Sequence, residues 1–132
     1  MREILFKAKR IDNGEWVEGL LTVMWGQYHI INPNDENTAY SIDNDTICQY
    51  TGLTDKNGKK IWENDIVAFL DTYYTESGYA EMDCIGKVGW ESEELCFYVT
   101  GRLSAESWEV FQECYVIGNI FDNPELMKGG AE

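Results

Sequence analysis

Two turns lie close together in residues 49–67, and this segment constrains the fold more than any other part of the chain. Its first turn is Asp-Lys-Asn-Gly at residues 55–58, where Asn and Gly favour the left-handed conformations that tight hairpins require. Its second turn is Glu-Asn-Asp at residues 63–65. Strand-forming side chains stand before, between and after these turns. The segment therefore predicts consecutive antiparallel hairpins.

The strand that follows the second turn, residues 66–70, is apolar on both faces. Alternation places Ile66, Ala68 and Leu70 on one face and Val67 and Phe69 on the other. A strand with one face in water would instead alternate apolar and polar side chains. We therefore expect residues 66–70 to form a central or barrel-forming strand.

Short strand-like segments separated by turn residues make up most of the remaining chain. Asn123-Pro124 predicts the start of a C-terminal helical turn, because Pro is favoured at the first helical position. Residues 104–109 fit either a helical turn capped by Ser104 or the beginning of a strand that contains Trp108. The other predicted strands cover residues 4–9, 16–23, 27–31, 40–42, 47–50, 59–62, 86–90, 95–100 and 115–121.

This pattern predicts a mainly β fold, because no segment shows the longer apolar periodicity of a helix. The 132 residues are expected to form a single domain. Within it, residues 1–46 are expected to form an N-terminal β-meander subdomain. Residues 47–123 are expected to form a small antiparallel barrel of the SH3-like kind, followed by a short C-terminal helical turn.

Three segments of the sequence resemble the YopX family of small phage and prophage proteins. The first contains Gln-Tyr-Thr-Gly-Leu at residues 49–53, Asp-Lys-Asn-Gly-Lys at 55–59, Ile61 and Asp-Ile-Val at 65–67. The second is Met-Arg-Glu-Ile at residues 1–4, with Lys-Arg at 9–10 and Asn-Gly-Glu-Trp-Val-Glu-Gly at 13–19. The third is Val-Ile-Gly-Asn-Ile at residues 116–120, with Asn-Pro-Glu-Leu at 123–126. Residues 71–107 match no part of the family pattern.

The resemblance implies a β-rich fold and a phage or prophage origin. It implies no activity, because the family has no assigned catalytic residues. Asn64 stands where the family usually has Gly, and Asn is among the residues that best tolerate positive φ. The resemblance and the turn patterns single out the following structural turn residues: Asn13, Gly14, Gly52, Asn57, Gly58, Asn64, Asp65 and Gly118.

The net charge of −14, from 24 acidic and 10 basic residues, limits the kinds of partner. It argues against direct binding of nucleic acid, which needs Lys and Arg to neutralise phosphates, and against an anionic membrane surface. It allows a basic protein partner, or it serves solubility alone. The sequence shows neither a signal peptide nor an apolar run of membrane-spanning length. We therefore expect a protein of the bacterial cytoplasm.

The sequence predicts no catalytic residue, no metal site and no cofactor. His29 is the single histidine, and it lies in a strand-like run where we expect it to face solvent. The cysteines, Cys48, Cys84, Cys96 and Cys114, contain no C-x-x-C pair and are expected to be free thiols. Asp65 could be read as catalytic, but a role in holding the turn at residues 63–65 fits it better. No glycine-rich loop that cradles phosphate is present.

Residues 71–85 are the least regular part of the sequence and the best candidate for contact with a partner. They fit either a long hairpin tip or a mobile loop, and the sequence does not decide whether they are ordered. Their tyrosines could contact a partner protein, or they could cover the edge of the barrel. An acidic turn follows at residues 91–94. The candidate interaction surface consists of Tyr73, Tyr74, Tyr79, Glu81, Asp83, Glu91, Glu93 and Glu94.

The sequence alone establishes no activity, and three functions fit it. The first is a non-enzymatic phage or prophage protein that acts through contacts with a host protein or through self-assembly into a homo-oligomer. The second is an acidic inhibitor that mimics nucleic acid toward a host protein, which a clustered acidic face would favour. The third is an enzyme with an unrecognised carboxylate site, which would need a deep polar pocket.

Overall fold

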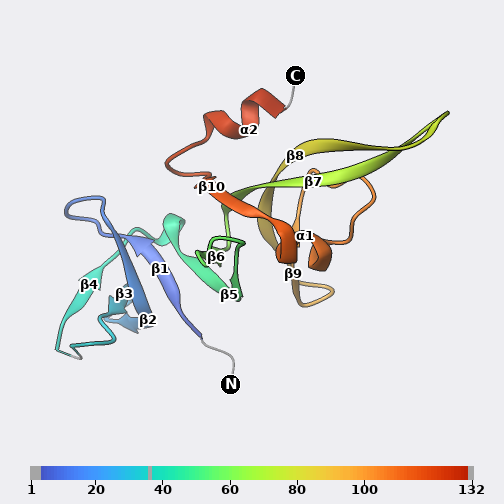
Figure 1. Ribbon diagram of the computed structural model, residues 1–132. Helices are drawn as coiled ribbons and strands as arrows, with labels where there is room; N and C mark the ends of the chain where they lie inside the picture. Colours follow the sequence, from blue (N-terminus) through green and yellow to red (C-terminus); the bar gives the residue numbers. More distant parts are fainter. Residues whose placement is uncertain (1–3, 36, 131–132) are drawn as a thin grey trace. The chain divides into compact units, whose positions relative to one another are not determined.

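The computed structural model describes residues 4–35 and 37–130 and has a mainly β fold with two antiparallel sheets (Figure 1). Contacts between Cα atoms divide the chain into two compact units, residues 1–52 and residues 53–132. The mainly β class and the antiparallel pairing agree with the sequence-based expectation. The closed SH3-like barrel stays a prediction.

The first unit is a sheet whose early strands follow one another both in sequence and in space. It contains β1 (Phe6–Lys9), β2 (Trp16–Met24), β3 (Gln27–Ile31), β4 (Ala39–Ser41), the 3₁₀ turn η1 (Asn44–Thr46) and the start of β5 (Cys48–Thr54). The strand order is β4-β3-β2-β1-β5. Its core is formed by Ala8, Ile30 and Ile42, each fully buried, with Phe6, Val17, Leu21 and Ile47 packed around them.

The second unit contains a four-stranded sheet and two short helices. Its elements are β6 (Lys60–Trp62), which pairs with the end of β5, then β7 (Asp65–Thr75), β8 (Gly78–Glu91), β9 (Cys96–Val99), α1 (Ser107–Glu113), β10 (Tyr115–Asn119) and α2 (Glu125–Gly130). The strand order is β10-β7-β8-β9. The strand predicted to be central is therefore central, since β7 lies between β10 and β8.

One face of this four-stranded sheet carries the larger core. Alternate residues of β7 and β8 point into it and meet the buried side chains of α1. The buried members are Ile61, Val67, Phe69, Cys84, Val88, Val99, Val110, Phe111 and Cys114. Helix α1 is thus held by burial of its apolar side, because seven residues are too few for an isolated helix in water.

Asp55 holds the first turn of residues 49–67, here called the signature segment, to the sheet of the second unit. Its Oδ1 atom accepts hydrogen bonds from the backbone N–H groups of Asn57 and Lys59, at 2.9 Å each, and Oδ2 accepts one from Val116 in β10 at 2.8 Å. Burial raises the pKa of Asp55, but these three hydrogen bonds outweigh burial and lower the pKa below its ordinary value. The charged carboxylate therefore joins the hairpin turn to the edge strand β10.

The second turn of the signature segment depends on Asn64 and Asp65. Asn64 has φ 72°, in the left-handed region, and so adopts the conformation that the usual glycine would provide. Its N–H donates to the carbonyl of Val88 and its own carbonyl accepts from Ile120. Asp65 accepts a hydrogen bond from the N–H of Trp62 at 2.8 Å. Asn64 thus serves the turn through its backbone, and Asp65 serves it through its side chain.

The other predicted turn residues lie as follows. Gly14, Gly52 and Gly58 have positive φ, at 72°, 88° and 81°. Asn13 accepts a hydrogen bond from the N–H of Glu15 in the β1–β2 turn. Gly118 does not lie in a turn but within β10, at a shift of the pairing register with β7. A Cβ atom there would come within 2.5 Å of the Asn123 side chain, so close packing, and not a turn, requires glycine.

Two details differ from the sequence-based expectations. Residues 71–75 and 78–85 are paired strand, so the alternative of a loop is wrong. Helix α1 begins at Ser107 and not at Ser104, because Ser104 instead bonds to Asp71. Cys96 is exposed at the start of β9, and Cys114 is buried at the end of α1, outside a strand. All four thiols are free.

We predict that Asp55→Ala lowers the free energy of unfolding by about 2 kcal/mol or more, because it leaves three backbone N–H groups without their acceptor. Urea denaturation measures this loss. Asp35→Ala is a matched control, since Asp35 accepts similar turn hydrogen bonds from Asn37 and Thr38 in an exposed loop. Equal losses from the two variants would contradict the role assigned to Asp55.

Candidate interaction surface

The β7–β8 hairpin extends beyond the strands on either side of it. Strand β10 pairs with β7 only as far as Ala68, and β9 pairs with β8 only from Val88 onward. Between these limits, residues 69–85 pair only within the β7–β8 hairpin of the described sheet, up to the last pair Thr75–Gly78. Figure 1 shows this segment as a narrow two-stranded ribbon. We call residues 69–85 the arm.

One face of the arm, here called the outer face, combines apolar side chains with carboxylates. Register places Leu70 opposite Asp83, Thr72 opposite Glu81 and Tyr74 opposite Tyr79, so these six side chains share that face. Leu70 is 61% exposed, Tyr74 76% and Tyr79 66%. Ile85, opposite Ala68, continues the face toward the sheet and is 39% exposed. Large apolar side chains are thus left in solvent along a whole strand pair.

The opposite face of the arm is braced by the loop between β9 and α1. The Asp71 carboxylate accepts hydrogen bonds from the N–H groups of Leu103, at 2.7 Å, and Ala105, at 3.1 Å. The hydroxyl of Ser104 lies within hydrogen-bonding distance of two acceptors, the same carboxylate at 3.2 Å and the carbonyl of Thr72 at 2.9 Å. Burial raises the pKa of Asp71, but the hydrogen bonds outweigh burial and lower the pKa. Asp71 therefore fixes the base of the arm and leaves the outer face uncovered by this loop.

The tip of the arm is rigidified by a tyrosine pair. The ring centroids of Tyr74 and Tyr79 lie 4.4 Å apart, and the Tyr79 hydroxyl donates to the Tyr74 hydroxyl at 2.6 Å. This hydrogen bond raises the pKa of Tyr79. In the two-residue turn beyond them, the Thr75 hydroxyl accepts from the N–H of Ser77 and donates to the carbonyl of Gly78. The two tyrosines form one amphipathic surface at the end of the arm.

The structure divides the predicted interaction surface into two places. Tyr74, Tyr79, Glu81 and Asp83 lie together on the outer face of the arm, whereas Tyr73 lies on the opposite face, 43% exposed. The acidic turn lies at the other end of β8, where Glu91 accepts a hydrogen bond from the N–H of Glu93 and Glu94 is exposed.

Sequence reasoning missed Leu70, Met82 and Ile85, which are also exposed on the arm. The signal that could have revealed them was their alternation along two strands, but it becomes visible only when residues 71–85 are recognised as strand.

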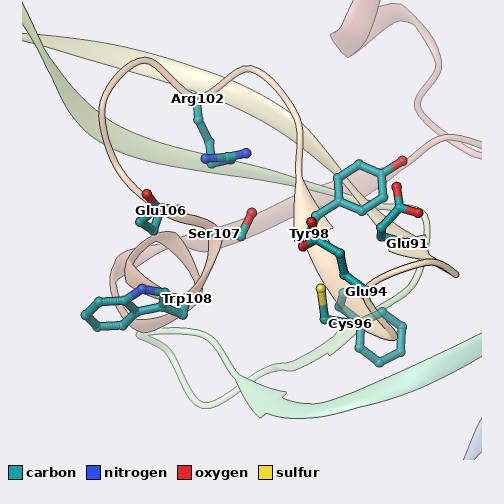
Figure 2. A pocket seen from close by; sticks show the side chains of 9 residues that line it. Glu91, Glu94, Cys96, Tyr98, Arg102, Glu106, Ser107 and Trp108 are labelled. Atoms are coloured by element: carbon teal, nitrogen blue, oxygen red, sulfur yellow. The ribbon is translucent and has the colours of Figure 1, made fainter.

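A hollow of about 510 Å³ lies elsewhere in the second unit, between the β8–β9 turn and the start of α1 (Figure 2). Arg102 donates to the carbonyls of Val99 and Ala105, and the Glu109 carboxylate accepts from the N–H of Glu106. These charged groups thus hold the loop and the helix. The hollow is lined by Glu91, Glu94, Cys96, Phe97, Tyr98, Arg102, Glu106, Ser107 and Trp108.

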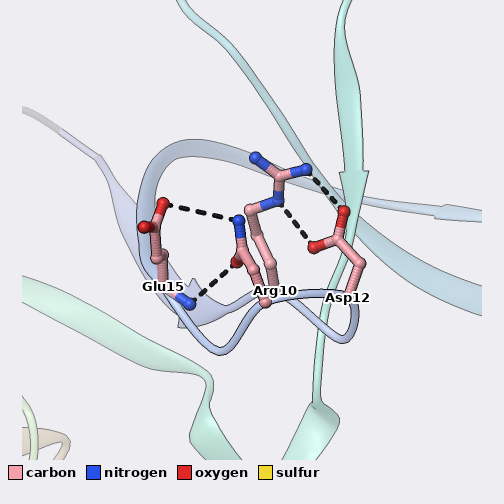
Figure 3. A network of polar contacts seen from close by, with 4 residues as sticks. Arg10, Asp12 and Glu15 are labelled. Atoms are coloured by element: carbon pink, nitrogen blue, oxygen red, sulfur yellow. Dashed lines mark hydrogen bonds and ion pairs between the residues drawn. The ribbon is translucent and has the colours of Figure 1, made fainter.

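The first unit contains two groups of polar side chains that contact one another. In Figure 3, Arg10 forms an ion pair with Asp12 at 2.6 Å and Asn13 bonds to Glu15, which closes the β1–β2 turn. His29 contacts the Ser41 hydroxyl at 3.2 Å and the carbonyl of Gln27 at 3.0 Å. Among the residues that the structure describes, no three His, Cys, Asp or Glu side chains are arranged to hold a metal ion.

A family model described as YopX protein matches residues 7–128. The chain belongs to the YopX family. The YopX match thus includes the signature segment, the arm and β10, and it extends the resemblance across residues 71–107. No curated protein matches the sequence. In the described part of the chain, neither helix is long and apolar enough to cross a membrane.

A solved structure shares the fold of this YopX chain. It is the crystal structure of protein EF1440 from Enterococcus faecalis, with a TM-score of 0.55 and 24% sequence identity. The similarity covers 96% of this chain and 99% of that one. It therefore concerns the whole length of both chains.

We predict that Asp71→Asn lowers the free energy of unfolding by about 1–3 kcal/mol at pH 7, because a neutral amide is a poorer acceptor for the N–H groups of residues 103–105. Since folding lowers the pKa of Asp71, its stabilising effect is complete above the unfolded pKa of about 3.9 and is lost as the pH falls through the folded value. The difference between wild type and variant should therefore shrink below about pH 4. Urea denaturation across this range measures it.

Asp83→Asn, which changes an exposed carboxylate of the same arm, is the control and should have little effect at pH 7. A stability difference for Asp71→Asn that stays constant down to pH 2 would contradict the assignment.

We predict that Cys96 reacts with a thiol reagent much faster than the other cysteines of the folded protein. Cys96 is exposed, whereas burial raises the pKa of Cys84 and raises that of Cys114 to about 11, and Cys48 is 1% exposed. With a chromogenic thiol reagent at pH 7.5, absorbance should show one rapidly reacting thiol per chain. This rapid reaction should be absent in Cys96→Ser. Several equivalents at the same rate would contradict the burial of the other thiols.

Proposed function

We propose that this YopX protein is a non-enzymatic phage or prophage protein of the bacterial cytoplasm that acts through contacts with other proteins, self-assembly included. The observation that carries the proposal is the arm, whose outer face leaves Leu70, Tyr74 and Tyr79 more than half exposed. Exposed apolar side chains grouped on one face favour a contact surface over a solvated one. An isolated two-stranded ribbon is only marginally stable in water, so a partner that covers the arm would also stabilise it.

The enzyme alternative receives less support from the side chains at hand. Ser41 and His29 lie on neighbouring strands, which is the pairing that an activated hydroxyl would need, but the other ring nitrogen of His29 contacts a backbone carbonyl and not a carboxylate. The hollow near α1 contains several carboxylates, yet Arg102 bonds to backbone carbonyls of the loop and Glu106 forms a capping box with Glu109. These contacts give Arg102 and Glu106 structural roles.

The nucleic-acid mimic is a weaker form of the same proposal. It calls for carboxylates clustered on one face, whereas the exposed carboxylates are spread over both units, for example at Asp12, Asp45 and Glu93. Those of the arm share a face with the exposed side chains of Leu70, Tyr74 and Tyr79. We therefore favour contact through the arm over mimicry by charge alone.

The proposal is tested by comparing the wild-type protein with the double variant Tyr74→Ser and Tyr79→Ser. Light scattering measures the mass of the purified protein, and cross-linking in the bacterial host measures its partners. We expect the variant to remain folded by circular dichroism and to lose the oligomer or the cross-linked partner. Leu95→Ser and Trp25→Ser are controls, since both side chains are exposed outside the arm.

A wild-type protein that is monomeric and forms no cross-link would contradict the proposed function. Association that persists in the arm variant would contradict the assignment of the arm.

A further inference from the structure

The arm carries acidic side chains and no basic ones. The sequence contains no Lys or Arg between Lys60 and Lys87, whereas Glu76, Glu81 and Asp83 are exposed in this span. The arm therefore carries negative charge that no basic side chain of its own segment offsets. A partner that approaches the arm meets a field of one sign.

The carboxylates and the apolar side chains of the outer face are paired across the two strands. Asp83 lies opposite Leu70 and Glu81 opposite Thr72, while Tyr74 and Tyr79 close the tip. Directly opposed side chains in an antiparallel pair lie about 5 Å apart at Cβ. Each carboxylate thus stands next to an apolar or hydroxyl-bearing neighbour and not next to a basic one.

The side chains of Lys and Arg fit this arrangement of apolar and acidic groups. Their aliphatic stems cover apolar surface while the charged end reaches an acidic group, so Leu70 and Ile85 can take the stems and Glu81 and Asp83 the charges. A guanidinium or ammonium group also binds over the face of an aromatic ring, which the tyrosine pair at the tip supplies. A second copy of the same arm would instead bring carboxylates together.

We propose that the outer face of the arm binds a Lys- and Arg-bearing surface of another protein. This inference rests on the proposed function and adds the chemistry of the partner. The tyrosines and Leu70 supply the contact area, and the carboxylates select basic partners and speed their approach. Binding should therefore weaken as the salt concentration rises.

The test uses the full-length protein and a twelve-residue peptide of alternating Lys and Val as the probe, with the same peptide carrying Ser in place of Lys as its control. NMR titration follows the backbone amides. We expect shifts concentrated at residues 70–85 with the Lys peptide and none with the Ser peptide. Raising the salt concentration should weaken the binding of the Lys peptide.

Matched variants separate the arm from charge in general. Glu81→Gln with Asp83→Asn should weaken binding about fivefold, as expected for the loss of two exposed ion pairs. Glu93→Gln with Glu94→Gln removes the same charge from the β8–β9 turn and should change binding less than about twofold. Leu70→Ser should also weaken binding, which an interaction through charge alone would not show.

Three outcomes would overturn the inference. Shifts spread over all acidic regions, with binding of the peptide weakened equally by both charge variants, would indicate nonspecific attraction of the peptide to a protein with a net charge of −14. Arm shifts that appear on raising the concentration of the protein alone, with a rise in mass, would assign the arm to a second copy and leave the proposed function intact. No binding of the peptide, together with an arm-dependent cross-linked partner in the host, would show that the partner is not basic.

Discussion

The fold of the second unit depends on buried aspartates that replace missing backbone partners. A turn or an edge strand leaves N–H groups that no strand can satisfy, and burying such a group without an acceptor is costly. Asp55 supplies the acceptor where the hairpin meets β10, and Asp71 supplies it where the β9–α1 loop meets β7. Each carboxylate joins segments that are far apart in sequence. Regular pairing forms the sheet, and these two side chains fix the irregular parts to it.

Most of the strands could be predicted from sequence, because turn chemistry in this chain is explicit. Asn13-Gly14, residues 55–58 and Asn64 mark turns by residue type, and the structure places positive φ at Gly14, Gly58 and Asn64. The sequence did not distinguish a helix from a strand at α1, because the apolar pattern of its seven residues is too short. Its position is set by burial of Val110 and Phe111, which is a property of the tertiary fold.

The candidate surface was only partly predictable for a related reason. The tyrosines of residues 73–79 were visible as unusual residues in a polar segment, but their grouping depends on register. Tyr74 meets Tyr79 and Tyr73 does not, because the two-residue turn sets which residues face each other. Leu70 read as core from the sequence, whereas its place beyond the end of β10 leaves it exposed. The exposure of Leu70 depends on where the neighbouring strand β10 ends. The sequence of β7 alone does not contain that information.

The unpaired sides of the arm have a consequence for the behaviour of the chain in concentrated solution. Apart from Thr72, whose N–H and carbonyl bond to Asp71 and Ser104, these sides present backbone groups to which another extended chain could add, which is the usual origin of edge-to-edge aggregation. Glu81 and Asp83 stand on β8 along one such side, and charged side chains on an edge oppose indiscriminate pairing. The same carboxylates thus oppose pairing of this accessible strand edge with the same edge of another molecule.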